Sequence, residues 1–283
     1  MQNKLFSWFF SFICKWIAML PLSTIHKIGA FFGWLFHSLD HKTKSTLVRN
    51  IKQSGIFTSQ RSLNDAINAN VQEMGKAILE SIAIWGSSQS AILSKIKAVR
   101  HSDLIQDAVA QKRGIIFLTP HIGAFEVASI YYAAKYPMTI LYRPTRKQWM
   151  NARVLQGRAK GHIKLAPTTV SGVKKLYIAL KQGEAVGILP DQIASKGEGE
   201  WANFFGKPVY TMVLASKLAM KTGAEIIMAV VERMPKGEGF ILHLERLTYA
   251  QIANGTLLNQ QIEQQVRKFP LQYMWSYDRY KQP

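Results

Sequence analysis

The sequence predicts an α/β fold in which a mixed, largely parallel sheet is flanked by helices and preceded by an N-terminal membrane-anchoring helical segment. Two observations carry this prediction: short β-branched runs alternate with helical runs over residues 114–247, and an apolar, aromatic stretch opens the chain. Such alternation is typical of sheets whose strands are joined by helical crossovers. With 283 residues, 48% of them hydrophobic, the chain suits one large domain with an appendage.

The opening stretch is close to one membrane-spanning length. Residues 5–22 read LFSWFFSFICKWIAMLPL, interrupted by Lys15, and a second apolar stretch follows at residues 28–39. A spanning helix needs roughly 20 apolar residues, and tryptophan rings suit the membrane interface. We therefore expect membrane attachment ahead of burial in a soluble core, either by spanning the bilayer or by lying in its interface.

The basic residues after this stretch predict how the protein is oriented relative to the membrane. Basic residues follow it closely, at Lys42, Lys44, Arg49 and Lys52. We expect residues 1–40 to form the anchor and residues 41–283 the main domain, which the positive-inside rule places on the cytoplasmic side.

The overall charge predicts a negatively charged partner. The chain has 36 Lys and Arg against 17 Asp and Glu, a formal net charge of +19. Nucleic acid, an anionic membrane, phosphorylated substrates and acidic proteins all suit such a field. Nucleic acid is disfavoured, because the sequence has no zinc finger, helix-turn-helix signature or RNP motif. The single cysteine, Cys14, excludes an intrachain disulfide framework.

The alternating strands and helices are assigned by the spacing of their apolar residues and by the turn residues that bound them. Strand-like runs cover residues 114–119, 138–143, 162–167, 185–190, 225–231 and 240–247. Helical runs cover residues 63–85, 124–134, 148–159, 170–181 and 211–221. Residues 191–209, with three glycines, a proline and no clear period, are expected to form a long loop, as a binding or lid segment or as a disordered tip.

The stretch GIIFLTPHIGAFEVA, residues 114–128, places His121 just after a predicted strand, where open α/β sheets bind their ligands. Glu126 follows five residues later. On one helix the two side chains would point about 140° apart, so they can meet only if His121 precedes the helix. Pro120 and Gly123 favour that change of direction.

A carboxylate bonded to one imidazole nitrogen leaves the other free to take a proton from a hydroxyl. Such a pair predicts base catalysis without a protein nucleophile. No GxSxG elbow supports covalent catalysis, and neither HExxH nor a clustered second histidine supports a metal site. Taken alone, the HxxxxE pattern of His121 and Glu126 favours a catalytic pair and two structural polar residues about equally.

Five segments, in order, resemble the late acyltransferases of lipid A biosynthesis, the lauroyl and myristoyl transferases of Gram-negative bacteria with an HxxxxD/E motif. The segments are TPHIGAFE, YRPTRKQWMNARVLQGRAKG, LPDQ, FFGKPVYT and PLQYMWSYDRYK. The resemblance implies a glycerolipid-acyltransferase-like fold and an inner-membrane enzyme without a cofactor. It implies transfer of an acyl chain from an acyl carrier protein thioester to a hydroxyl on an acyl chain of a lipid A precursor. Acyl carrier protein, this precursor and the anionic inner membrane would then all use the basic surface.

Carried onto matching positions, the resemblance makes His121 the general base and Glu126 its partner. Arg158 would stabilise the thioester oxyanion or bind a phosphate, because guanidinium donors match oxyanions. The implied substrate-binding residues are Arg143, Asp191, Gln192, Phe205 and Gly206.

Several of these positions have a second interpretation. Arg143 equally suits a structural role on loop carbonyls, and Asp191 with Gln192 would bind substrate or order the long loop. The FFG segment, Phe204 to Gly206, would mainly pack around an acyl channel. Trp275, Tyr277 and Arg279 match the family's C-terminal signature and are expected to cap the site.

Two alternatives stay open from the sequence. One is an acyltransferase acting on another membrane glycolipid or on a lysophospholipid. The other is a membrane-tethered basic binding protein that has lost catalysis, against which the intact His121, Glu126, Arg158 and Asp191 speak.

Overall fold

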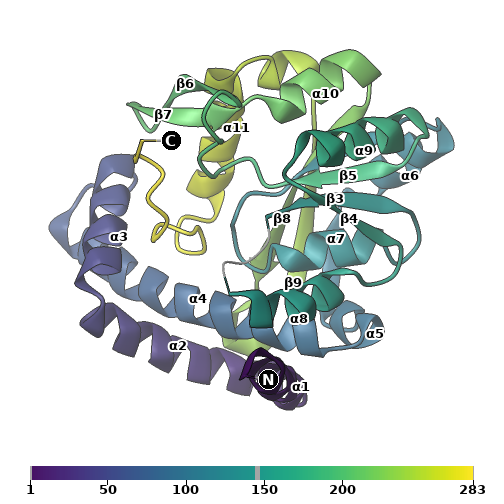
Figure 1. Cartoon of the computed structure of the whole chain (residues 1–283). Coiled ribbons are helices and arrows are strands. Elements are labelled where there is room, and N and C mark those ends of the chain that lie inside the picture. The colour runs from purple at the N-terminus through teal and green to yellow at the C-terminus, as the bar shows by residue number, and fades with distance from the viewer. Residues whose placement is uncertain (1, 144–146, 283) are drawn as a thin grey trace.

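The computed structural model describes residues 2–143 and 147–282 and shows a seven-stranded sheet between layers of helices (Figure 1). The strand order is β1-β9-β8-β2-β5-β3-β4. Strands β8, β2, β5, β3 and β4 run parallel, whereas β9 is antiparallel to β8. The predicted mixed, largely parallel α/β sheet is confirmed.

The sheet strands are β1 (Ile96–Arg100), β2 (Ile115–Leu118), β3 (Met138–Tyr142), β4 (Ile163–Pro167), β5 (Ala185–Ile188), β8 (Glu225–Arg233) and β9 (Phe240–Leu247). All six strands expected from the sequence are present, and β1 is an unexpected edge strand. Its burial pattern shows no strict alternation, so the sequence offers little sign of it.

The helices are α1 (Gln2–Ala18), α2 (Leu22–Leu39), α3 (His41–Ser54), α4 (Gln60–Gly86), α5 (Gln89–Leu93), α6 (Asp103–Ala110), α7 (Glu126–Tyr132), α8 (Gln148–Arg158), α9 (Val170–Lys181), α10 (Leu214–Thr222) and α11 (Gly255–Lys268). Two short 3₁₀ helices, η1 (Pro235–Gly237) and η2 (Tyr249–Ile252), flank β9. The five expected helices are confirmed as α4, α7, α8, α9 and α10.

Strand β2 lies at the centre of the sheet, and all four of its residues are buried. Ile116 and Leu118 join the core on the face covered by α9, α10 and α11, whereas Ile115 and Phe117 join the core on the face covered by α6 and α7. A strand buried on both faces needs a continuous apolar run, which explains why β2 has no polar alternation.

The expectation of a long loop over residues 191–209 is wrong. Strands β6 (Gly199–Phe204) and β7 (Lys207–Met212) form an antiparallel hairpin there. Its two turn residues, Phe205 at φ 47° and Gly206 at φ 76°, both have positive φ, as tight hairpin turns require. Positive φ is uncommon for phenylalanine, and the usual Asn-Gly or Asp-Gly signal is absent, so the turn was not recognisable.

The N-terminal helices α1 and α2 pack against α4 along one side of the molecule (Figure 1). Gly29 and Gly33 on α2 face Gly75 on α4, and a Cβ added at Gly29 would lie 2.8 Å from the Gly75 carbonyl oxygen. Small residues therefore let the two backbones approach closely. None of the helices in the described part of the chain is both long and apolar enough to cross a bilayer. Membrane anchoring by this segment stays a prediction.

A buried ion network ties this helical layer to the sheet. Arg233 at the end of β8 donates from Nε to Glu80 Oε2 at 2.9 Å and from Nη1 to Glu73 Oε2 at 2.6 Å. His26 of α2 bonds the same Glu80 at 2.9 Å. Burial alone would raise the pKa of Glu80, but Arg233 and His26 outweigh it and hold that pKa below its ordinary value.

Candidate active site

The loop that carries His121 connects β2 to α7. The strand ends at Leu118, and α7 begins at Glu126, so His121 precedes the helix as predicted. Gly123 adopts φ 58°, and its N–H donates to the Gln272 carbonyl at 3.0 Å. A side chain at this position would also clash with the Val231 carbonyl. The change of direction therefore depends on glycine, as the sequence predicts.

The C-terminal segment holds the same loop from the other side. The N–H of Met274 donates to the His121 carbonyl at 3.0 Å, and Ile122 pairs with Tyr273 in an antiparallel bridge. The Ile193 N–H donates to the Tyr277 hydroxyl at 3.2 Å. The C-terminal signature thus packs beside the site, and buried Arg279 donates from Nη1 to the Tyr210 carbonyl at 3.1 Å.

Asp191 is the carboxylate that bonds His121. Its Oδ1 lies 2.8 Å from His121 Nδ1, and its Oδ2 accepts the His121 backbone N–H at 2.9 Å. Asp191 is 2% exposed. Burial would raise its pKa, but the charge and hydrogen bonds of His121 outweigh burial and hold the pKa below its ordinary value. An ionised Asp191 requires a proton on Nδ1.

The predicted hydrogen bond between His121 and Glu126 is not present in the described structure. Glu126 instead accepts from Arg158, whose single Nε–H is shared between Oε1 at 2.9 Å and Oε2 at 3.1 Å and whose Nη2 donates to Oε1 at 2.5 Å. The reason is the position of β5, which lies beside β2 and delivers Asp191 to the imidazole. Glu126, at the start of α7, meets Arg158 at the end of α8.

The second ring nitrogen of His121 meets Gln192. Gln192 Nε2 lies 3.2 Å from His121 Nε2, and with the proton on Nδ1 the amide N–H donates to the bare Nε2. In this tautomer of the neutral imidazole, the lone pair of Nε2 faces Gln192 and points away from Asp191. That is the form in which histidine takes a proton from a hydroxyl.

One cavity of about 360 Å³ unites most of the predicted site. A volume of this size is typical of small-ligand sites. Its polar lining includes His121, Glu126, Arg143, Arg158 and Gln192. Its apolar lining includes Phe125, Met138, Ile140, Leu141, Gly187 and Leu189. The cavity therefore combines an imidazole and two guanidinium groups with several apolar side chains.

Of the remaining predicted residues, one contacts His121 from outside the cavity, one lies at the rim and two lie away from it. Asp191 lies behind His121 and does not line the cavity. Arg143 lies at its rim, 3.4 Å from Ser195 Oγ, and the rest of the YRP segment, residues 144–146, is outside the described residues. Phe205 and Gly206 form the hairpin turn and do not line this cavity. Phe205 instead packs on Trp275, at 5.8 Å between ring centroids.

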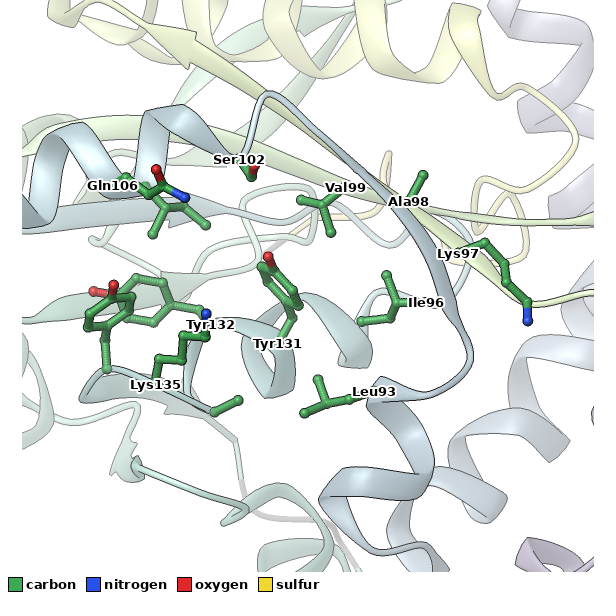
Figure 2. A pocket seen from close by; sticks show the side chains of 13 residues that line it. Leu93, Ile96, Lys97, Ala98, Val99, Ser102, Gln106, Tyr131, Tyr132 and Lys135 are labelled. Atoms are coloured by element: carbon green, nitrogen blue, oxygen red, sulfur yellow. The ribbon is translucent and has the colours of Figure 1, made fainter.

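A second cavity of about 370 Å³ lies between β1, α6 and α7 and is shown in Figure 2. Tyr131 of α7 and Lys135, which follows that helix, face Val99 and Gln106 across it (Figure 2). It shares no lining residue with the cavity of His121. Across residues 2–143 and 147–282, no cluster of three or more His, Cys, Asp or Glu side chains is arranged to hold a metal.

Comparison with known proteins decides the family. The sequence profile of bacterial lipid A biosynthesis acyltransferase matches residues 1–282. The chain belongs to the bacterial lipid A biosynthesis acyltransferase family. Among curated members, it is 25% identical to the lipid A biosynthesis palmitoleoyltransferase of Escherichia coli K12 over 271 residues, which cover 94% of this chain and 87% of that enzyme.

Two other members of the lipid A acyltransferase family are similar over the same extent. The lipid A biosynthesis lauroyltransferase of E. coli K12 is 23% identical over 274 residues, 94% of this chain and 88% of that enzyme. A lipid A biosynthesis acyltransferase of Haemophilus influenzae is 22% identical over 280 residues, 95% of this chain and 88% of that enzyme. The chain is therefore an acyltransferase of lipid A biosynthesis.

Sequence patterns alone missed part of this candidate site. The link between Asp191 and His121 spans 70 residues, so no local spacing signals it. The adjacency of predicted strands would have been the available clue, because both residues follow parallel strand ends. Met138 and Gly187 line the same cavity, but their sequence context indicates only that they lie in strands.

Proposed function

We propose that the protein transfers a fatty acyl chain from acyl carrier protein to a hydroxyl on an acyl chain of a lipid A precursor, with His121 as general base. The observation that carries this proposal is the orientation of the imidazole. Nδ1 is held by buried Asp191, while Nε2 lies in the cavity that also contains Arg158.

The reaction needs no protein nucleophile. The acceptor hydroxyl displaces the Gln192 amide from Nε2 of His121. Nε2 then takes the hydroxyl proton as the hydroxyl oxygen attacks the thioester carbonyl carbon. The carbonyl oxygen becomes an oxyanion, the tetrahedral adduct collapses, and the carbon–sulfur bond breaks. The imidazolium then returns the proton to the departing thiolate, so the ester and the free carrier thiol are the products.

Arg158 is placed to stabilise the oxyanion. Its bonds to Glu126 use Nε and Nη2. Among the described residues Nη1 has no hydrogen-bond acceptor, so it can donate to a substrate oxygen. Burial opposes the charge, but Glu126 outweighs burial and raises the pKa of the guanidinium above its ordinary value. Glu126 therefore acts through Arg158, as the residue that positions it.

The test is an assay of the purified protein with acyl carrier protein thioesters and a lipid A precursor, followed by mass spectrometry. The wild-type protein is expected to add one acyl chain to the precursor, and His121→Ala to lose transfer while keeping its melting temperature. Lysophospholipid and simple glycolipid acceptors serve as controls. Efficient acylation of these acceptors but not of the precursor would contradict the proposed substrate.

We also propose that the protein resides at the inner membrane with its catalytic domain in the cytoplasm, attached through α1 and α2. These helices expose large aromatic side chains: Phe6, Trp8, Phe9, Phe12, Trp16, Phe31, Phe32, Trp34 and Phe36. Several are mutual neighbours, with ring centroids 6.1 Å apart for Trp8 and Phe12. Exposed apolar side chains gathered in this way suit a membrane interface.

The basic helix α3 follows this aromatic surface directly. Lys42, Lys44 and Lys52 are exposed on it, which suits anionic headgroups. Sedimentation with anionic vesicles measures the attachment. Trp8→Ser combined with Phe12→Ser is expected to lower the bound fraction, whereas Tyr249→Ser, at an exposed aromatic outside these helices, is a matched control. Equal loss in both variants would refute the assignment to α1 and α2.

A further inference from the structure

Gly187 is a residue without a side chain in the buried strand β5, near the centre of the sheet. It lies on β5 between Phe117 of β2 and Ile140 of β3, its register partners on the two sides. Glycine weakens a buried strand, and within one it often marks a place where another group approaches closely. No turn explains it here, because β5 continues through it to Ile188.

The gap above Gly187 opens into the catalytic cavity. Gly187, Met138 and Ile140 all line the cavity that contains His121. A Cβ added at Gly187 would lie 2.9 Å from Met138 Cε and 3.4 Å from Ile140 Cγ1. The end of the flexible Met138 side chain therefore lies over the glycine.

Gly187, Met138 and Ile140 lie within β5 and β3, before the carboxyl ends of these strands. His121 follows the carboxyl end of β2, whereas Met138 begins β3 and pairs with Ala185 at the start of β5. On the opposite wall, Glu126 is in the first turn of α7 and Ser129 one turn further in. The cavity thus runs from the reacting nitrogen, past the ion pair of Glu126 and Arg158, to an apolar floor.

We propose that Gly187 and Met138 form the floor that sets the length of the acyl chain accepted from the donor. This inference rests on the proposed acyl transfer and assigns its specificity-determining residues. The chain enters with its carbonyl at His121 and its methyl end against Met138, over the space that Gly187 leaves open. Methionine suits a floor of this kind, because its unbranched side chain adapts to an irregular gap.

The test compares Gly187→Ala and Met138→Ala with the wild-type protein on thioesters of saturated chains that differ by two methylene groups. Each methylene that loses its burial lowers kcat/KM about fourfold. The methyl of Gly187→Ala fills the gap and pushes Met138 into the cavity. We expect kcat/KM for the preferred chain to fall about four- to fifteenfold, and the optimum to move to a shorter chain. Met138→Ala deepens the cavity and is expected to move the optimum to a longer chain.

Val186→Ile is the matched control. It adds one methyl to the same strand, but Val186 packs in the core on the opposite face of the sheet. We expect it to leave the chain-length profile unchanged, with melting temperatures checked for all three variants. Calorimetric binding of free fatty acids of the same lengths provides a readout that does not need turnover.

Opposite shifts in Gly187→Ala and Met138→Ala, in turnover or in fatty acid binding, would support the floor. Unchanged profiles in both, or an equal shift in Val186→Ile, would overturn it. The proposed function is tested separately by the wild-type protein. If it binds fatty acids with the expected length dependence yet acylates no lipid A precursor, acyl transfer fails and the floor stands.

Discussion

Asp191→Asn isolates the hydrogen bond that sets the protonation of His121. In the native site, the two carboxylate oxygens of Asp191 accept two N–H groups, the backbone N–H and the ring Nδ1 of His121. An amide has only one oxygen. The backbone N–H always carries its hydrogen, so the asparagine oxygen is expected to face it and the amide NH₂ to face Nδ1.

The expected consequence is the wrong tautomer. An NH₂ group facing Nδ1 favours a bare Nδ1 and moves the proton to Nε2, where it blocks abstraction of a hydroxyl proton. General base catalysis contributes about 10²- to 10⁴-fold to a rate, so kcat should fall by that amount, or about 2.7–5.4 kcal/mol in the barrier. The fold should persist, because the two side chains have nearly the same shape.

The assay measures kcat for acyl transfer in Asp191→Asn, His121→Ala and the wild-type protein, with ¹⁵N NMR of the imidazole to report the tautomer. A variant that retains kcat within about tenfold of the wild-type value, with a proton on Nε2, would refute the argument, since a positioned base is worth more than that. A large loss of kcat with the native tautomer intact would also refute it, because Asp191 would then act in another way.

Glu126→Gln should lower transfer by weakening the hold on Arg158 while leaving the His121 tautomer unchanged, and Arg158→Lys should lose most of the same activity because an ammonium cannot form the same fork. A double-mutant cycle that shows independent effects on kcat would contradict this coupling. Glu80→Ala should destabilise the protein by about 3–5 kcal/mol in urea unfolding, because it removes a partner of buried Arg233, and a loss below about 1 kcal/mol would contradict it. Acid should destabilise the protein, because the pKa values of Glu80 and Asp191 are lower in the folded protein than in the unfolded chain. The stability that these two carboxylates contribute is complete at a pH above the ordinary carboxyl pKa, and it is lost as the pH falls through their folded-state pKa values. Urea titrations from neutral to acid pH measure this loss, and stability that does not change with pH would refute it.

Local sequence patterns were sufficient for most of the sheet. The runs that became β2, β5 and β9 are apolar or β-branched and bounded by turn residues, so their conformation follows from short-range preferences. The hairpin of β6 and β7 was missed because its turn places Phe205 at positive φ, which only its tertiary surroundings compensate. The Glu263 carboxylate accepts the Phe205 N–H at 2.6 Å and helps to hold this turn.

The sequence by itself determined that His121 leaves the strand before the helix, because Pro120 and Gly123 act on the backbone locally. It also determined the family, through motifs distributed along the whole chain. Only the tertiary structure decided which carboxylate meets the imidazole. Glu126 is near in sequence, but helix α7 turns it toward Arg158, whereas Asp191 is 70 residues away and reaches His121 because β5 lies beside β2. Strand order, which depends on long-range packing, therefore selects the carboxylate that bonds His121.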